Sequence, residues 1–218
     1  MTQRPLMREA AGPDRDDLPP PDLRSEPRLC TLFRTGKLLT TEGETICRVR
    51  NISANGFMAD AFPAPAVGAQ VALELCEGRS QAATVVWAQA DRFGARFAAP
   101  RSVPEMITEA FGSPNHRHRA LRVMPRSGFA TIVHGDHVAR ASIVNISQTG
   151  LQVFAFERFL SAATQRDVRI EIDGLDPTEG ILCWVRHGAA GIQFMRPLSF
   201  EALAHWLWAT SLAAGPAA

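Results

Sequence analysis

Three short patterns occur twice in this chain, in the same order. They are an Arg-x-x-x-Arg segment with an internal proline, an Asn-Ile-Ser-x-x-Gly motif followed by a large apolar residue, and a Trp followed by Gly-x-x-Phe. The two copies are separated by 94 to 98 residues, which is too long for one unit of a solenoid. The sequence therefore predicts two similar domains of roughly 100 residues each. The paired segments are Arg24–Arg28 and Arg122–Arg126, residues 51–57 and 145–151, and residues 86–97 and 183–194.

Each copy consists mainly of short segments in which apolar residues alternate with polar ones or form short runs. Turn-forming residues such as EGE, EGRS and DGLDPTEG separate these segments. Because no helical pattern intervenes between them, we expect a mainly β fold with two tandem small antiparallel six-stranded β-barrels. Five of the expected strands can be placed in each copy, at residues 31–39, 45–52, 56–62, 70–75 and 82–90, and at residues 129–133, 139–146, 151–156, 167–172 and 180–186.

A C-terminal α-helix is expected after each barrel. Ser102-Val-Pro-Glu105 has the form of a capping box with proline in the first turn, and Ser199 precedes a second helical pattern. In that second pattern, Leu203, Trp206, Leu207 and Thr210 share one face. The predicted domain organisation is a disordered N-terminal tail (1–21), a first barrel (22–112), a linker (113–121), a second barrel (122–213) and a short C-terminal tail (214–218).

The composition is that of an ordinary globular protein, with 46% hydrophobic residues, 21% charged residues and a formal net charge of +1. No apolar run approaches the ~20 residues that a membrane span requires. The N-terminal residues have charges and prolines where a signal peptide would be apolar, so we expect a cytoplasmic protein without membrane insertion. The four cysteines are scattered, which favours reduced thiols over a disulfide or zinc framework.

The arginine pairs lie directly before the first expected strand of each copy. A proline inside each segment favours an extended backbone, and an extended arm can lie over a barrel. Two guanidinium groups then suit a phosphate or the O6/N7 edge of guanine. For a single pair, a solvated basic linker is the better interpretation, but the recurrence of the pair favours a binding role.

The Asn-x-Ser-x-x-Gly motifs place two polar side chains on the same face of a strand. Asn offers a donor and an acceptor, Ser offers a hydroxyl, and the glycine would allow a positive φ and close approach of a ligand. A strand that ends in an Asx or Ser turn is the alternative interpretation of either motif alone.

The aromatic residues of the third pattern, Trp87, Trp184, Phe97 and Phe194, are predicted to belong to the barrel cores, and stacking on a ligand is the less favoured alternative. The sequence contains no Ser/His/Asp arrangement, no zinc-ligand spacing and no phosphate-binding Gly loop, so we expect neither catalytic residues nor a metal or other cofactor. The near-zero net charge also argues against binding of a nucleic acid polymer through the segment RHRALRVMPR.

The ordered combination of these motifs resembles the PilZ domain, whose members are bacterial receptors for the second messenger cyclic di-GMP. The resemblance covers about residues 24–112 and 122–212. It implies that the arm arginines contact the phosphates and guanines of the ligand, while the barrel motif contacts guanine and completes the pocket. The implied ligand-binding residues are Arg24, Arg28, Asn51, Ser53 and Gly56 in the first copy, and Arg122, Arg126, Asn145, Ser147 and Gly150 in the second.

The resemblance implies a non-enzymatic signalling protein. Binding of cyclic di-GMP would change the arrangement of the two domains and their contact with a downstream protein partner, in motility, exopolysaccharide or cell-cycle control. The alternative hypothesis is a degenerate protein-interaction adaptor that binds no nucleotide.

Overall fold

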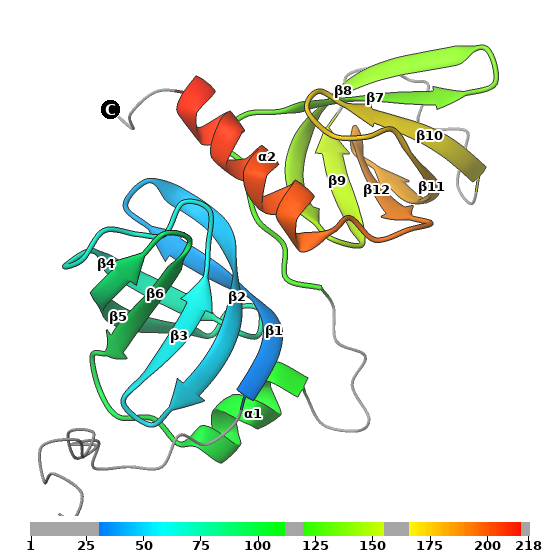
Figure 1. The fold of residues 1–218 in the computed structure, drawn as a ribbon. Helices are drawn as coiled ribbons and strands as arrows, with labels where there is room; N and C mark the ends of the chain where they lie inside the picture. Colours follow the sequence, from blue (N-terminus) through cyan, green and yellow to red (C-terminus); the bar gives the residue numbers. More distant parts are fainter. Residues whose placement is uncertain (1–30, 112–119, 155–165, 215–218) are drawn as a thin grey trace, which may run out of the picture.

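The computed structural model describes residues 31–111, 120–154 and 166–214. Within them the chain forms two closed six-stranded antiparallel β-barrels and two α-helices, which confirms the predicted fold class (Figure 1). The predicted N-terminal tail lies outside the described residues, as do residues 113–119 of the predicted linker.

The first barrel has the strand order β1-β2-β3-β6-β5-β4, and it closes where β1 pairs with β4. Every neighbouring pair of strands is antiparallel. The strands are β1 (Thr31–Thr40), β2 (Gly43–Ser53), β3 (Gly56–Asp60), β4 (Gln70–Glu74), β5 (Ser80–Gln89) and β6 (Arg92–Phe97).

The second barrel repeats this topology, with the order β10-β11-β12-β9-β8-β7 and closure between β7 and β10. Its first strand is shorter than that of the first barrel: β7 has 6 residues and β1 has 10. The strands are β7 (Phe129–His134), β8 (His137–Ser147), β9 (Gly150–Phe154), β10 (Arg166–Ile172), β11 (Thr178–Arg186) and β12 (Ala189–Phe194).

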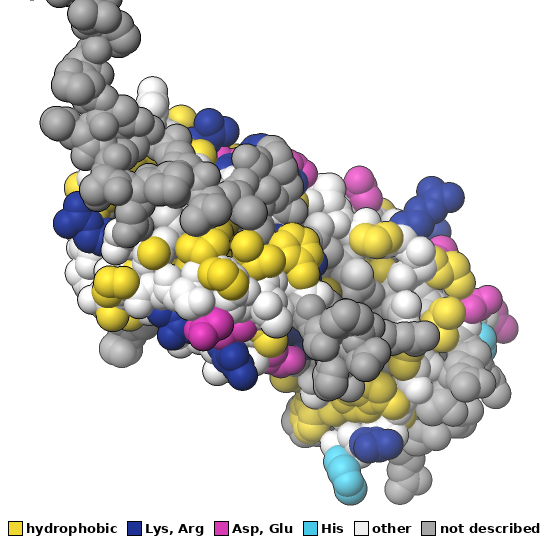
Figure 2. Space-filling view, turned by 90° about the horizontal axis from the view of Figure 1, so that it is seen from below, with side chains coloured by type: hydrophobic (Ala, Val, Ile, Leu, Met, Phe, Trp, Pro, Cys, Tyr) yellow, Lys and Arg dark blue, Asp and Glu magenta, His cyan; other side chains and the backbone are white. Residues whose placement is uncertain are grey.

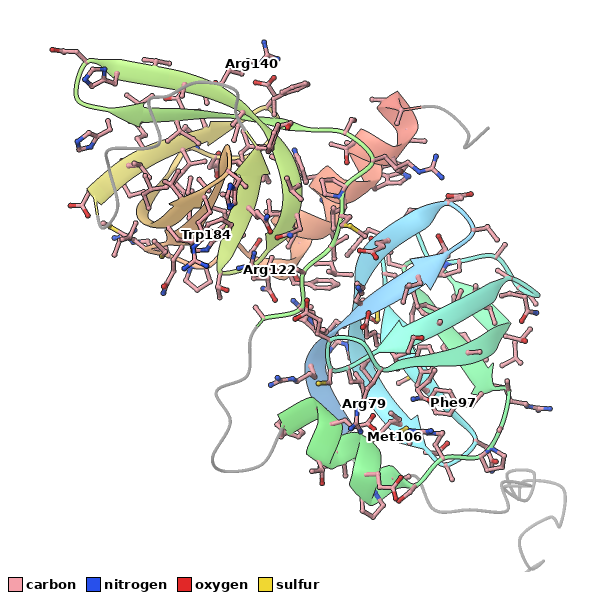
Figure 3. All side chains as sticks on the ribbon, turned by 180° about the vertical axis from the view of Figure 1, so that it is seen from behind. Arg79, Phe97, Met106, Arg122, Arg140 and Trp184 are labelled. Atoms are coloured by element: carbon pink, nitrogen blue, oxygen red, sulfur yellow. The ribbon has the colours of Figure 1, made fainter. Side chains whose placement is uncertain are left out.

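Each barrel has its own apolar core, formed by the inward-facing residues of its strands. Helix α1 (Val103–Phe111) packs on the first barrel, where Met106 is buried in the same cluster as Phe97 (Figure 3). Helix α2 (Phe200–Ala213) packs on the second barrel through the buried residues Leu203, Trp206 and Leu207. The predicted N-cap of α2 is confirmed, because the Ser199 side chain accepts a hydrogen bond from the Ala202 N–H at 3.0 Å.

Helix α2 also joins the two barrels, since it lies between them and contacts β2 (Figure 1). Ile46 of β2 is 1% exposed and belongs to the core cluster of the second barrel and α2, although β2 is a strand of the first barrel. Arg48, two residues further along the same face, forms an ion pair with Glu201 at 2.9 Å, and its guanidinium lies 4.4 Å from the Phe200 ring centroid. The interface between the barrels therefore combines apolar burial with a charged contact at its edge.

The surface seen in Figure 2 carries apolar side chains on both barrels, interrupted by charged ones. Neither of the two helices in the described part of the chain is long and apolar enough to cross a membrane.

Candidate functional site

The same two β-bulges occur in both barrels, and the first barrel has a further register shift between Thr31 and Arg34 on β1. In the second barrel the register shifts between Ile143 and Asn145 on β8 and between Leu182 and Trp184 on β11. The first barrel has the same shifts between Val49 and Asn51 and between Val85 and Trp87. A bulge places two residues opposite one and redirects the side chains that follow. The motif asparagine and the tryptophan of each copy thus both follow a bulge.

The strand register brings these two motifs into one row across four strands. In the second barrel, Asn145 pairs with Gln152, Gln152 with Gly191, and Gly191 with Trp184. In the first barrel the corresponding row is Asn51, Met58, Gly94 and Trp87. The polar motif and the tryptophan, which are remote in the sequence, are therefore neighbours on the outer face of each barrel.

The glycine in each row provides space for the indole ring. A Cβ atom built on Gly191 would lie 2.1 Å from Trp184 Nε1, and a Cβ atom on Gly94 would lie at the same distance from Trp87 Nε1. The indole therefore lies directly over the glycine of the neighbouring strand, a position that any larger residue would block.

The prediction that both tryptophans belong to the barrel cores is wrong. Trp87 is 39% exposed, Trp184 is partly exposed, and each lines a recess on the outer face of its barrel. Strict alternation after the buried residues Val85 and Leu182 would turn the indoles inward, but the bulges turn them outward. The same prediction is confirmed for Phe97 and Phe194, which are 6% and 4% exposed.

The serine and glycine of each Asn-x-Ser-x-x-Gly motif form the turn between two strands. The Ser147 hydroxyl donates to the Gly150 carbonyl at 3.1 Å, and Ser53 donates to Gly56 at 3.2 Å. Neither glycine uses the positive φ that its lack of a side chain would allow. A Cβ atom on Gly56 or Gly150 would lie 2.3 Å from a carbonyl oxygen of the adjacent strand, so the glycine permits close strand approach.

The recess of the second barrel has a volume of about 620 Å³ and contains a connected set of polar groups. Arg122 Nη1 donates to Asn145 Oδ1 at 2.8 Å, and Asn145 Nδ2 donates to Gln152 Oε1 at 2.9 Å. Hydrogen bonds to a charged donor are short and strong, so Asn145 fixes the position of the guanidinium. The same recess is lined by Ser147, Thr149, Gly150, Cys183, Trp184 and Gln193. Figure 3 shows Arg122 and Trp184 on the same side of this barrel.

The segment that carries Arg122 also contacts the first barrel. Val123 is fully buried and forms a β-bridge with Ile146, so the segment is hydrogen-bonded to β8 beside the motif. The Met124 N–H donates to Glu44 Oε2 of β2 at 2.9 Å. Arg126 passes beside the β1–β2 turn, where a Cβ atom on Gly43 would lie 3.4 Å from Arg126 Nε. Of the two predicted arm arginines, the structure thus brings Arg122 to the recess and places Arg126 against the first barrel.

The recess of the first barrel has a volume of about 360 Å³ and is lined by the predicted residues Asn51, Ser53 and Gly56. The predicted arginines Arg24 and Arg28 lie outside the described residues. Arg96 of β6 also lines this recess, at the position that Gln193 has in the second barrel. Met58 stands where the second barrel has Gln152, so it cannot hold the amide of Asn51 in the same way.

Sequence reasoning did not assign Trp87, Trp184, Arg96 or Gln152 to the sites. The bulges that expose the tryptophans have no distinct sequence signal. The signal for Arg96 and Gln152 was available, because both positions follow from aligning the two copies and applying the period of two along each strand.

The topology and the two rows define a tandem β-barrel protein with a polar, aromatic-edged recess on each barrel. Residues 22–109 match the sequence model of the PilZ domain, and this range includes all six strands of the first barrel. The similarity to the PilZ domain thus covers the first barrel. None of the curated proteins matches the sequence.

Solved structures similar to this chain include the Bacillus subtilis inhibitor of motility MotI/DgrA. It has 12% sequence identity and a TM-score of 0.36, with 84% of this chain and 98% of that chain covered. PlzA of Borreliella burgdorferi in complex with c-di-GMP has 14% identity and a TM-score of 0.33, with 81% and 88% covered. YcgR of Escherichia coli in complex with c-di-GMP has 14% identity and a TM-score of 0.32, with 84% and 85% covered. The bound ligand in these two complexes is a property of those proteins.

Proposed function

We propose that this chain is a cytoplasmic, non-catalytic receptor for cyclic di-GMP with one site on each barrel, the second barrel being a PilZ domain as well. The observation that carries the proposal is the recess of the second barrel, where Arg122, Asn145 and Trp184 converge. The repeat of the same row on the first barrel, which matches the PilZ domain, supports a site there too.

The residues of the recess suit the chemistry of this ligand. Cyclic di-GMP has two anionic phosphodiesters and two guanine bases, so its site requires cationic groups, hydrogen-bonding groups and a flat apolar surface. Arg122 supplies the cation, while Asn145, Gln152 and Gln193 supply donors and acceptors. Trp184, which is partly exposed and lines the recess, supplies an aromatic surface for a base, and base–aromatic stacking is worth about 1–3 kcal/mol.

Ligand binding is proposed to change how the barrels sit together. If Arg126 is to reach the ligand, its side chain must leave the Gly43 turn of the first barrel. A shift of the arm also strains the hydrogen bond from Met124 to Glu44. A ligand shifts an equilibrium between two arrangements only by its differential affinity for them. The contacts of Arg126 and Met124 provide such a difference in affinity, because binding would have to break or strain them in the present arrangement. The altered surface would then engage a protein partner in motility, exopolysaccharide or cell-cycle control.

Calorimetric titration with cyclic di-GMP tests the proposal. The wild-type chain is expected to bind at both barrels, and Arg28→Ala and Arg122→Ala are each expected to remove the ligand bound at one barrel. Arg140→Ala is the matched control, because Arg140 stacks on Phe129 at 4.8 Å and does not line the recess (Figure 3).

A wild-type chain that gives neither binding heat nor a thermal shift would overturn the receptor proposal. That result would favour the adaptor hypothesis. Retention of DNA or RNA at physiological salt, lost in Arg122→Ala, would instead indicate a nucleic-acid site.

A further inference from the structure

The recess of the second barrel includes one residue from the first barrel. Glu77 belongs to the turn between β4 and β5, and it lines the same recess as Arg122 and Asn145. Its side chain is exposed, and no ion pair of Glu77 is found within the described residues. A carboxylate of one barrel thus faces the candidate anion site of the other.

Local contacts fix the position of this turn. The Gly78 N–H donates to the Glu74 carboxylate, and the Arg79 N–H donates to the Cys76 carbonyl at 3.1 Å. The Arg79 guanidinium forms an ion pair with Glu109 of α1 at 2.9 Å. The turn that carries Glu77 is therefore tied to β4 and to α1.

One direct hydrogen bond between the barrels is made by the motif of the second barrel. Thr35 of β1 donates to Gln148 Oε1 at 2.9 Å, and Gln148 Nε2 donates to the Leu198 carbonyl at 3.1 Å. Gln148 is one of the two variable residues inside the Asn-Ile-Ser-x-x-Gly motif of the second barrel. The turn of that motif is therefore hydrogen-bonded to the first barrel, the barrel that carries Glu77.

We propose that Glu77 is an acidic gate, which lowers the affinity of the second barrel for an anionic ligand as long as the barrels keep this arrangement. This inference rests on the proposed function. Coulomb repulsion requires proximity rather than a particular hydrogen-bond geometry, so a shared recess is sufficient for it. Arg122 and Glu77 are the two charged residues among the described residues that line the recess, and their formal charges cancel.

The gate also couples binding to the arrangement of the barrels. When the first barrel moves away, Glu77 leaves and the net charge of the described recess becomes positive. The ligand then binds the separated arrangement more tightly, and it shifts the population towards that arrangement. Glu77 thereby links ligand affinity at one barrel to the position of the other.

The test compares Glu77→Gln with Glu105→Gln, an exposed residue of α1 on the same barrel that lines none of the recesses. Both variants change the net charge equally. In titrations with cyclic di-GMP at low ionic strength, Glu77→Gln is expected to bind roughly three- to tenfold more tightly than wild type, and Glu105→Gln is expected to match wild type. At 0.5 M salt the gain should fall below about twofold, because the Debye length shrinks to a few ångströms.

The increase in affinity is expected at the second barrel. It should therefore disappear when Glu77→Gln is combined with Arg122→Ala. Small-angle scattering should show that the ligand-induced change in shape is smaller in Glu77→Gln than in wild type. Unchanged or weaker binding by Glu77→Gln, with wild-type binding intact, overturns the gate alone. Absence of binding by both proteins at every salt concentration overturns the gate and the receptor proposal together.

Discussion

Asn145 and Trp184 belong to the same cross-strand row of the second barrel, with Gln152 and Gly191 between them. Each of the two residues is uninformative alone, since an asparagine before a turn and a tryptophan in a strand both have ordinary structural explanations. The row joins a polar group to an aromatic edge on one outer face. This relationship is what makes the recess a candidate site for a nucleotide.

Replacement of Gly191 by alanine is predicted to displace the indole of Trp184, because the added Cβ atom would lie 2.1 Å from Nε1. The loss of one base–aromatic contact, about 1–3 kcal/mol, corresponds to a decrease in affinity of roughly 5- to 150-fold at the second barrel. Tryptophan emission should change in the same variant. Gly94→Ala is the matched substitution in the first barrel and should affect only that site. Unaltered emission and affinity in Gly191→Ala would show that the row is not part of a site.

Cys183 provides a chemical probe of the second recess. Its side chain is exposed and lines this recess, whereas Cys47 is fully buried, and desolvation raises the pKa of the Cys47 thiol to about 12. Since the thiolate is the reactive form, Cys47 should remain unmodified in the native protein. In a Cys30→Ser, Cys76→Ser background, Cys183 should react with a maleimide, and saturating cyclic di-GMP should slow the reaction. Equal rates with and without ligand would place the bound ligand elsewhere.

The repeat in the sequence was sufficient to predict two antiparallel barrels, each with a helix, because motif order and the period of two survive in both copies. The motif turns were also predictable, since Asn, Ser and Gly have local turn preferences. The exposed tryptophans were not predictable, because a bulge adds one residue to a strand and reverses the face of the residues after it. Contacts between the barrels, such as those of Glu77 and Gln148, depend on how two folded surfaces meet, which a strand pattern does not contain.

The single lysine of the described chain, Lys37, is predicted to support the first barrel through a partly buried ion pair. Lys37 Nζ lies 2.8 Å from Glu74 and 3.5 Å from Glu44, and the Glu74 side chain is 5% exposed. Lys37→Met would leave the Glu74 carboxylate buried without this partner, at a cost of about 3–5 kcal/mol in the free energy of unfolding. The double variant with Glu74→Leu should recover most of that loss. Chemical denaturation checks this, and a double variant no more stable than Lys37→Met would contradict it.

The same ion pair predicts the direction in which stability changes at high pH. Burial alone would lower the pKa of Lys37, but the hydrogen bond to Glu74 and the nearby carboxylates outweigh it, so the pKa is raised. A pKa raised in the folded state means that the contribution is fully present below the ordinary lysine value of about 10.4 and is lost as pH rises through the folded value. The stability difference between wild type and Lys37→Met should therefore shrink above about pH 10.4, as measured by urea unfolding.

The ion pairs of Asp60 predict a loss of stability at low pH, in contrast to the loss at high pH predicted for Lys37. Its carboxylate accepts hydrogen bonds from Arg92 Nε at 2.9 Å and from Arg50 Nε at 2.5 Å. Burial alone would raise the pKa of Asp60, but these two arginines outweigh burial and lower the pKa. A lowered pKa means that the carboxylate stabilises the fold above the ordinary aspartate value of about 3.9 and loses this effect as pH falls through the folded value.

Asp60→Asn is therefore expected to reduce the free energy of unfolding at pH 7 by about 1–3 kcal/mol, because hydrogen bonds to a charged acceptor are lost. The difference from wild type should shrink as pH falls below about 4, because the carboxyl is then protonated in the unfolded chain before it is protonated in the folded one. Asp176→Asn, in an exposed turn of the second barrel, should leave stability nearly unchanged at both pH values. Urea unfolding followed by circular dichroism measures all three proteins. A difference for Asp60→Asn that grows as the solution becomes more acidic would mean that burial, and not the two arginines, controls the ionisation of Asp60.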